Sequence, residues 1–307
     1  MAVGIRDMTT RSGDPYAVLR IAAQYVSRFR GSLFVLKLSG MLAEDPLRMS
    51  ALAEQIRLIV AFGIRVILVH GAGSEIDREC LRCGIAVEKI GGRRITTPAV
   101  LEIVTESYRM INQKWVIALE AEGLKAVGVT GHTGGLLTAT PRPDGPAPGR
   151  AGPVSWGAVG DLEGVDAEGF RAWMEQETIA VVAPLTRGPH GEILNSNADT
   201  VAAGVAACLG AGKLIFLLNV PGLLRNRADR TTVIPYADLA DLARLEIEGG
   251  IQDGMIVKVR ALESALRRGV ESAHLVSGTD PDALVREVFT HEGSGTMIVA
   301  SKPETVP

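Results

Sequence analysis

The chain has 307 residues, of which 47% are hydrophobic and 22% charged, and its formal net charge is −3. This is a globular composition, and the charge gives no electrostatic reason to expect a nucleic-acid partner. No apolar run is long enough to span a bilayer, and the first residues lack the apolar core of a secretion signal. Three cysteines are an odd count, so we expect a reducing, cytoplasmic compartment rather than a disulfide framework.

Apolar β-branched runs alternate with helical patterns along the first half of the chain. We predict an amphipathic helix over residues 15–31, further helices over 45–62 and 74–83, one long helix or two over 98–123, and strands over 33–40, 64–73 and 125–131. Residues 138–160 are rich in Pro and Gly, which predicts a hairpin or an exposed loop.

The second half continues the alternation. We predict strands over residues 179–185, 213–220 and 272–278, and helices over 199–210 and 254–269. Unbroken Val/Ile/Leu strands separated by helices indicate an α/β protein whose mostly parallel sheet is covered on both faces. Ligands of such sheets bind beyond the carboxyl ends of the strands, which is where glycine and polar clusters occur in this sequence.

The clearest glycine cluster is HGAGS, His70–Ser74. Small residues at a strand-to-helix turn let the backbone approach a ligand, and the amides at the start of the helix favour an anion. A tight turn that needs glycine torsions is an equally good interpretation. The cluster is not a dinucleotide-binding fingerprint, and no P-loop motif occurs in the chain.

Two lysines and one aspartate are candidates for phosphate chemistry. Lys37 lies in an apolar strand, where an unpaired charge is costly to bury, and Lys258 follows a glycine at the start of a helix. Asp199 would stay ionised between two ammonium groups and orient them toward an anionic substrate. Fixed cations of this kind neutralise the charge of a transferring phosphoryl group. Taken alone, Lys37 is better explained as a strand-end lysine that reaches solvent, and Lys258 also fits a lysine on the helix surface.

The stretch from Asn195 to Thr200 places two amides and the Asp199 carboxylate at a helix entrance. One such residue is enough for capping, and we assign that role to Asn197. The remaining polar side chains suggest that this entrance also holds a ligand.

Five motifs resemble those of the amino acid kinase family, in order and rough spacing. They are KLSG (37–40), HGAG (70–73), GRRIT (92–96), NSNAD (195–199) and DGMIVK (253–258). The resemblance covers about residues 30 to 300 and is strongest to members that act on N-acetyl-L-glutamate. It implies an open αβα sandwich with two lobes, an acetylamino-acid lobe (31–190) and an ATP lobe (191–307). An N-terminal helical extension (1–30), which would serve oligomerisation, precedes them.

The reaction implied by the resemblance is phosphorylation of the side-chain carboxylate of N-acetyl-L-glutamate in arginine biosynthesis. ATP would be the donor, with Mg²⁺ held mainly by the nucleotide and no metal ligands assigned in the protein. The catalytic residues would be Lys37, Lys258 and Asp199. The substrate would contact Gly71, Ala72, Arg94 and Asn195, with Arg94 pairing its α-carboxylate and Asn195 its acetylamino group. The nucleotide would contact Gly40, Asn219, Leu223, Gly254 and Met255, within the bordering runs 219–223 and 253–258.

The sequence departs from the family pattern at two positions. Ala72 replaces the middle residue of a three-glycine run, which matters only if that residue needs a positive φ. Asn219 stands where the family commonly has an aspartate, so its contact to the ribose or to a lysine is in question.

Regulation and two alternative functions stay open at this point. The 15–31 helix and the tail residues 292–296 resemble those of hexameric, arginine-inhibited members, although a helix that packs on its own lobe fits equally well. We therefore expect a homodimer or a hexamer, with arginine as a hypothetical inhibitor. The alternatives are a kinase of carrier-linked aminoadipate in lysine biosynthesis and a non-catalytic arginine-sensing domain, which the retention of Lys37 and Lys258 disfavours.

Overall fold

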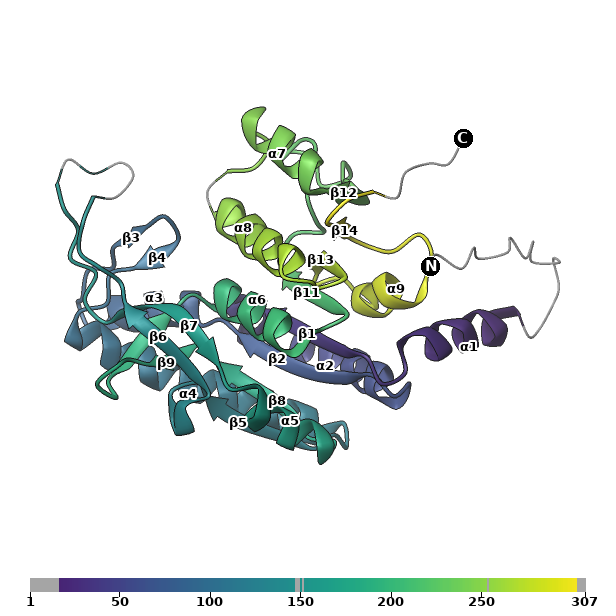
Figure 1. The fold of residues 1–307 in the computed structure, drawn as a ribbon, viewed down its shortest axis with the longest axis horizontal. Helices are drawn as coiled ribbons and strands as arrows, with labels where there is room; N and C mark the ends of the chain where they lie inside the picture. Colours follow the sequence, from purple (N-terminus) through teal and green to yellow (C-terminus); the bar gives the residue numbers. More distant parts are fainter. Residues whose placement is uncertain (1–16, 147–149, 151, 253, 303–307) are drawn as a thin grey trace.

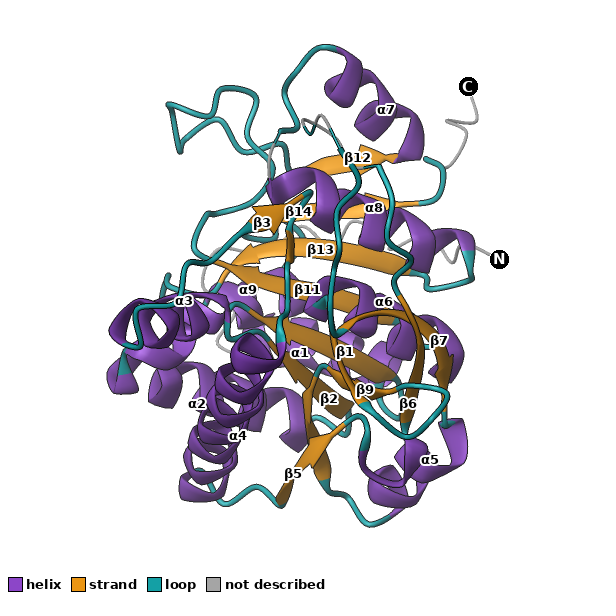
Figure 2. Cartoon of the chain, turned by 90° about the vertical axis from the view of Figure 1, so that its left-hand side faces the viewer, coloured by secondary structure: helices purple, strands orange, loops and turns teal. Residues whose placement is uncertain are grey.

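A computed structural model describes residues 17–146, 150, 152–252 and 254–302. In this part of the chain, eight strands form a central sheet with the order β12-β14-β13-β11-β1-β2-β8-β5 (Figures 1 and 2). Their bounds are β1 Leu33–Leu38, β2 Arg65–His70, β5 Ala126–Thr130, β8 Ile179–Ala183, β11 Lys213–Leu218, β12 Tyr236–Asp238, β13 Ser272–Ser277 and β14 Thr296–Val299. Only the pairing of β13 with β14 is antiparallel among the neighbouring pairs of this described sheet. The predicted mostly parallel sheet is therefore confirmed.

Helices cover both faces of the sheet, as the predicted αβα sandwich requires. One core contains side chains of α1 Ala17–Phe29, α2 Pro46–Ala61, α3 Gly73–Arg82, α4 Pro98–Ala121 and α9 Ala283–Phe289. The other contains side chains of α5 Ala167–Glu175, α6 Ala198–Leu209, α7 Leu239–Ile247 and α8 Gly254–Arg267. Strand β1 supplies both cores, because successive side chains of a strand point to opposite faces. Phe34 and Leu36 enter the first core, and Leu33 and Val35 enter the second.

Polar caps fix where the helices near the strand ends begin. Asp45 accepts the amide of Leu47 at 2.9 Å, and Pro46 occupies the first turn of α2, where a missing N–H costs nothing. Thr97 and Pro98 begin α4 in the same way, and α4 is one continuous helix rather than two. None of the described helices is both long and apolar enough to cross a bilayer.

A smaller closed sheet packs against α6. It contains β6 Leu137–Pro141, β7 Val159–Val165, β9 Leu185–Arg187 and β10 Ile193–Ser196. Strands β6 and β7 pair in antiparallel fashion, which confirms the hairpin interpretation of residues 138–160. A separate hairpin joins β3 Lys89–Ile90 to β4 Arg93–Arg94, and short 3-10 turns follow β1 (Gly40–Glu44) and β5 (Thr133–Gly135).

Candidate active site

Beyond the carboxyl ends of β1 and β2, the main chain of small residues forms a concave turn, which we call the cradle. A Cβ on Gly40 would lie 3.0 Å from Gly71 O and 3.1 Å from Ala72 N, so a side chain at residue 40 would displace the neighbouring loop. The Gly71 amide donates to Leu38 O at 2.9 Å and ties the two strand ends together. The three cradle residues predicted from the sequence, Gly40, Gly71 and Ala72, are thus brought together.

The alanine in the glycine run is accommodated without strain. Ala72 has φ −140° and ψ 20°, and its side chain is buried in the first core beside α3. A positive φ, which would demand glycine, is not used at this position. The departure from the family's three glycines therefore leaves the backbone path intact.

Asp199 joins the two predicted lysines. Lys37 Nζ lies 2.8 Å from Asp199 Oδ1, as a close ion pair rather than an aligned hydrogen bond. Lys258 Nζ donates to Oδ2 at 3.0 Å. Lys37 comes from β1, Asp199 from the first turn of α6 and Lys258 from the second turn of α8, and α6 and α8 pack against each other. Lys37 reaches Asp199 because it alternates onto the same face of β1 as Leu33 and Val35, which α6 covers.

Burial and charge act against each other in this triad. Lys37 is 6% exposed and Asp199 is 4% exposed. Burial raises the pKa of the Asp199 carboxyl, but the two ammonium groups outweigh it and the net pKa lies below its usual range. Burial, opposed by Asp199 and reinforced by Lys258, lowers the pKa of Lys37. One carboxylate between two ammonium groups leaves the triad with an excess positive charge, which favours an anionic ligand.

Asn197 holds the entrance of α6 as predicted. Its Oδ1 accepts the amides of Asp199 at 2.9 Å and of Thr200 at 3.0 Å. The cap fixes the first turn of the helix and thereby the place from which Asp199 reaches the lysines.

Arg94 lies next to the cradle on strand β4. Its Nη1 is 2.7 Å from Asp77 Oδ1, and its Nη2 donates to Gly73 O at 3.0 Å. Its neighbour Arg93 points elsewhere and pairs with Asp161 at 3.2 Å. The Arg94 side chain is 6% exposed and that of Arg93 is 24% exposed, so Arg94 is the one built into the site.

Asn195 is linked to Arg94 through Thr96. Asn195 Nδ2 donates to Thr96 Oγ1 at 3.1 Å, and Thr96 Oγ1 donates to Arg94 O at 2.9 Å. The amide oxygen of Asn195 makes no hydrogen bond within the described part of the chain, and it remains available as an acceptor for an N–H group.

The predicted nucleotide residues come from the segment after β11 and from the start of α8. Asn219 follows this strand, is exposed, and contacts Met41 Sδ at 3.7 Å. Leu223 has a buried side chain, and its amide donates to Thr296 Oγ1 at 2.9 Å. Gly254 and Met255 begin α8, one turn before Lys258. Asp253, in the same predicted run, lies outside the described residues.

The structure adds positioning residues that sequence reasoning missed. Asp77 orients Arg94, and Thr96 orients Asn195. Ser74 Oγ, at the start of α3, is shielded from solvent and has no hydrogen-bond partner among the described residues. The sequence signal for Ser74 is its place in HGAGS, whereas nothing in the sequence ties Asp77 or Thr96 to its partner.

Comparison with known sequences gives a consistent group of relatives. A model described as the amino acid kinase family matches residues 32–277. The acetylglutamate kinase of Myxococcus xanthus (strain DK1622) is 44% identical over 302 residues, covering 95% of this chain and 97% of that protein. The acetylglutamate kinase of Archaeoglobus fulgidus is 35% identical, covering 90% and 96%. The chloroplastic acetylglutamate kinase of Arabidopsis thaliana is 34% identical, covering 92% and 79%.

Solved structures with the same fold include enzymes of other activities. N-acetylglutamate synthase from Neisseria gonorrhoeae, in complex with coenzyme A and L-arginine, matches 94% of this chain with a TM-score of 0.82 and 25% identity. The match spans 66% of that synthase chain. Carbamate kinase from Giardia matches 88% of this chain and 99% of its own with a TM-score of 0.65, and its 16% identity supports the fold alone.

Asp199→Asn should destabilise the protein, because it leaves two ammonium groups facing each other without a carboxylate. Breaking a buried ion pair in this way costs about 3–5 kcal/mol of unfolding free energy. The folded-state pKa of Asp199 is depressed, so its contribution is present above the unfolded value of roughly 4 and is lost as pH falls through the lower folded value. Denaturant unfolding between pH 7 and 3 should therefore show the two proteins converging below about pH 4. The exposed Asp280→Asn variant is the control, and an equal loss at every pH would contradict the charge argument.

Proposed function

The chain belongs to the amino acid kinase family. We propose that Lys37, Lys258 and Asp199 promote transfer of the γ-phosphoryl group of ATP to the side-chain carboxylate of N-acetyl-L-glutamate, in arginine biosynthesis. The observation that carries this proposal is the pairing of Lys37 and Lys258 on Asp199, beside the main-chain cradle. Relatives named acetylglutamate kinase match nearly the whole chain.

Lys37 and Lys258 place two positive charges against the oxygens of the phosphoryl group in transfer, and Asp199 keeps both ammonium groups at a fixed separation. A carboxylate oxygen of the substrate forms the new bond to the γ-phosphorus as the bond from that phosphorus to the β–γ bridging oxygen breaks. The products are the acyl phosphate and ADP, which leaves with the bridging oxygen. The substrate carboxylate is already ionised near neutral pH, so the reaction needs no general base. The amides of Gly40 and Ala72 in the cradle add hydrogen bonds to the same anionic centre, while the Gly71 amide is engaged by Leu38 O.

Arg94 and Asn195 select the acceptor in this proposal. A guanidinium held by Asp77 and Gly73 O keeps further N–H donors for a carboxylate, which it can bind through two parallel hydrogen bonds. The free Asn195 oxygen suits the N–H of an acetylamino group. We assign the acceptor to residues 31–190 together with Asn195.

The nucleotide side is assigned to residues 191–307, and to Gly40 at the cradle. Asn219 follows β11, Gly254 and Met255 begin α8, and Leu223 contributes by holding the local backbone because its side chain is buried. A Mg²⁺ ion would take its ligands mainly from the phosphates, since both oxygens of Asp199 are engaged by lysines. Within the described residues, no three His, Cys, Asp or Glu side chains are grouped to hold a metal.

Lys258→Ala should reduce turnover by at least about 10³-fold, because it removes one of the fixed charges that stabilise the transferring group. ADP release should be measured with N-acetyl-L-glutamate, with N-acetyl-aminoadipate, with carrier-linked aminoadipate and with no acceptor. Turnover of the wild type only with the first acceptor is the expected result. The exposed Lys125→Ala variant should match the wild type. Turnover with carrier-linked aminoadipate alone would instead identify a kinase of lysine biosynthesis.

Arg94→Lys should raise the KM for acetylglutamate about 10- to 100-fold, since a hydrogen bond to a charged group contributes about 1.5–3 kcal/mol. Turnover at saturating acceptor should change far less. Initial rates over a range of acceptor concentrations measure both constants, with Arg93→Lys as the matched neighbour. Equal effects of the two substitutions would remove the assignment of Arg94 to the acceptor.

We also propose that L-arginine binds beside the tail residues 292–296 and inhibits the enzyme. Glu287 accepts the amides of Ser294 at 2.7 Å and Gly295 at 2.9 Å, so the tail is wrapped around a carboxylate. Burial raises the pKa of Glu287, but the contacts to His274 and to these two amides outweigh burial. The net pKa lies below its usual range, so the carboxylate is ionised. Lys213 lies close by, 3.0 Å from His274, and burial lowers its pKa to about 8.

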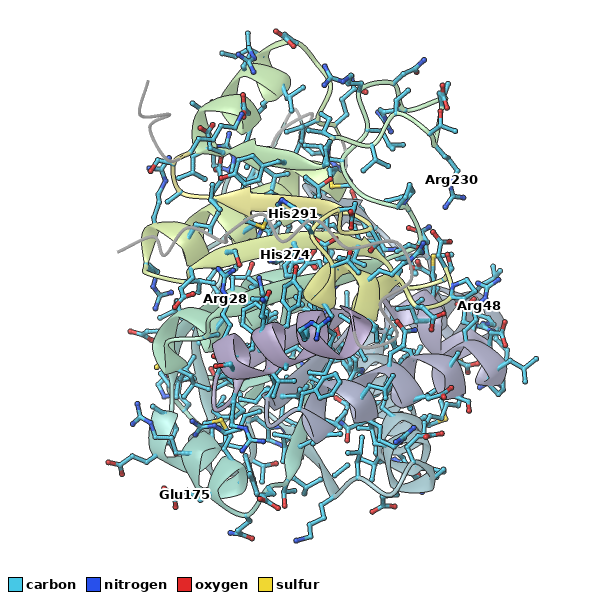
Figure 3. All side chains as sticks on the ribbon, turned by 90° about the vertical axis from the view of Figure 1, so that its right-hand side faces the viewer. Arg28, Arg48, Glu175, Arg230, His274 and His291 are labelled. Atoms are coloured by element: carbon cyan, nitrogen blue, oxygen red, sulfur yellow. The ribbon has the colours of Figure 1, made fainter. Side chains whose placement is uncertain are left out.

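The Glu287 carboxylate and the Lys213 ammonium, which both contact His274, suit the two ends of arginine, since a carboxylate can pair with a guanidinium and an ammonium with an α-carboxylate. This charge pair lies against the end of α1, where the Lys213 ammonium is 5.1 Å from the centre of the Phe29 ring. The charge of Arg28 on α1 also lowers the pKa of Lys213, and Figure 3 shows Arg28 and His274 on the same side of the molecule. The synthase of Neisseria gonorrhoeae that shares this fold was solved with L-arginine bound.

Assembly as a homodimer or hexamer is part of the regulatory proposal. Strand β5 is an edge of the described sheet, and Ile117 on the neighbouring helix α4 is 57% exposed. A hollow of about 520 Å³ beside it is lined by Val116, Val129 and Trp173 among others. An unpaired strand with an apolar flank suits pairing with a second copy. Helix α1 would then link dimers, although Tyr25 and Phe29 also pack it on its own chain.

Excess L-arginine should inhibit the wild type, and Glu287→Gln should weaken that inhibition at least about 10-fold, because the guanidinium loses its charged partner. Activity against arginine concentration measures the effect, and sedimentation with and without arginine measures the assembly. Glu271→Gln, an exposed change of the same type, is the control. Dimers only, together with full activity in excess arginine, would rule out the regulatory proposal.

A further inference from the structure

His70 is a fully buried imidazole directly behind the cradle. It is the last residue of β2, has no exposed surface, and immediately precedes Gly71. Its Nε2 lies 3.1 Å from Asn112 Nδ2, and its Nδ1 lies 3.4 Å from Gly71 O. The proposed chemistry gives this polar side chain no contact with either substrate, so its burial requires another explanation.

The partners of Asn112 determine which ring nitrogen carries the proton. Asn112 Nδ2 also donates to Val181 O at 2.7 Å and faces Val129 O at 3.4 Å, and carbonyl oxygens can only accept. The NH₂ group is therefore the part of the amide that faces His70, so Nε2 is an acceptor. Burial lowers the pKa of His70 to about 4, which keeps the ring neutral. The single ring proton then resides on Nδ1, facing Gly71 O.

Holding the Gly71 carbonyl fixes the amide that follows it. The C=O of Gly71 and the N–H of Ala72 belong to one planar peptide unit, in which they point in opposite directions. A Gly71 carbonyl held by His70 therefore fixes the direction of the Ala72 N–H. Gly40 approaches both ends of this peptide unit, because a Cβ at residue 40 would lie 3.0 Å from Gly71 O and 3.1 Å from Ala72 N. That N–H has no hydrogen-bond acceptor among the described residues.

We propose that His70, held by Asn112, is a positioning residue that aims the Ala72 amide at the phosphoryl group in transfer. The inference rests on the proposed kinase function and adds a second layer to its site. Asn112 lies on α4, far from both lysines in the sequence, and Gly128 on β5 leaves room for it. A Cβ at residue 128 would lie 2.0 Å from Asn112 Oδ1.

Removing the imidazole should affect catalysis more than binding. His70→Ala should lower kcat by at least about 10-fold, since a misplaced donor of an oxyanion-type site loses part of the 10²–10³-fold that such a donor contributes. The KM values for ATP and acetylglutamate should stay within about twofold, because the donor acts on charge that develops in the transition state. His70→Asn retains a donor near the Nδ1 position and should recover most of the kcat.

Three results would overturn the inference. These are a wild-type kcat in His70→Ala with only a lower melting temperature, an increase in KM with unchanged kcat, or no recovery in His70→Asn. Calorimetric binding of ATP checks that each variant is folded. Failure of the proposed function itself appears separately, as wild-type protein that does not phosphorylate acetylglutamate.

Asn112→Asp provides a test through pH. A carboxylate facing Nε2 demands a proton there and raises the pKa of His70. While the ring is an imidazolium, Nδ1 keeps its proton and the amide stays in place. As pH rises through the new pKa, the remaining proton stays on Nε2 and Nδ1 loses its own, so kcat should fall at alkaline pH.

The groups that face the His70 ring are few, so this profile can be assigned. They are Lys37 from β1 and Tyr108 from α4, whose ring centre is 5.8 Å away, while β8 (Ile179–Ala183) contributes no titratable side chain. The wild type should lack the alkaline loss, because its His70 is already neutral above about pH 4. The exposed Gln113→Glu change on the same helix is the matched control. An Asn112→Asp profile that superimposes on the wild type would overturn the inference.

Discussion

A single buried carboxylate organises the proposed active site. Asp199 is 4% exposed and is the acid that both Lys37 and Lys258 contact, so neither lysine can keep its position without it. The three residues come from a strand, the first turn of one helix and the second turn of another. Charges taken out of water are tolerated when they are paired, and this pairing constrains how β1, α6 and α8 pack together. The triad keeps an excess positive charge, and an anion is the ligand that completes it.

The same edge of the sheet supplies neutral donors from the main chain. A side chain on Gly40 would crowd the Gly71–Ala72 backbone, because a Cβ there would lie only 3.0–3.1 Å from its atoms. Ala72, by contrast, is tolerated because its φ is negative and its methyl group points into the core beside α3. The requirement at this turn is therefore a close approach of two backbones, and it restricts residue 40 rather than residue 72. In the proposed function, these amides and the two ammonium groups act together on the transferring phosphoryl group.

The sequence predicted the elements that hydrophobic patterning controls. Buried strands such as β1 and β11 are mostly apolar runs. The single charge inside β1, Lys37, became a candidate site residue because an unpaired charge is costly to bury. The β3–β4 hairpin was not predicted, because two-residue strands of Lys, Ile and Arg carry no periodicity. Strands β9 and β10 were not predicted either, because runs of three and four residues are too short to show a periodic pattern.

Partners that meet only through the fold were also beyond sequence reasoning. Asp77 lies 17 residues before Arg94, Thr96 lies 99 residues before Asn195, and Asn112 lies 42 residues after His70. Each is an ordinary helix or loop residue until the tertiary structure brings its partner alongside. Residues that contact the ligand can be predicted because their side-chain type suits the chemistry. Residues that only hold them in place are recognised from the tertiary structure alone.

The β3–β4 hairpin, which carries Arg94, packs against helix α8, which carries Lys258, through a glycine. Gly92, at the turn between β3 and β4, has φ +74°, and a Cβ there would lie 2.8 Å from Val257 Cγ2. Val257 directly precedes Lys258 on α8, and Gly92 is two residues before Arg94. The hairpin that carries Arg94, which we propose binds the acceptor, therefore touches the helix that carries Lys258, which we propose binds the transferring phosphate. A left-handed turn without a side chain is what permits this approach. Any shift of α8 toward the cradle must be matched by the hairpin, so the positions of Arg94 and Lys258 are set jointly rather than independently.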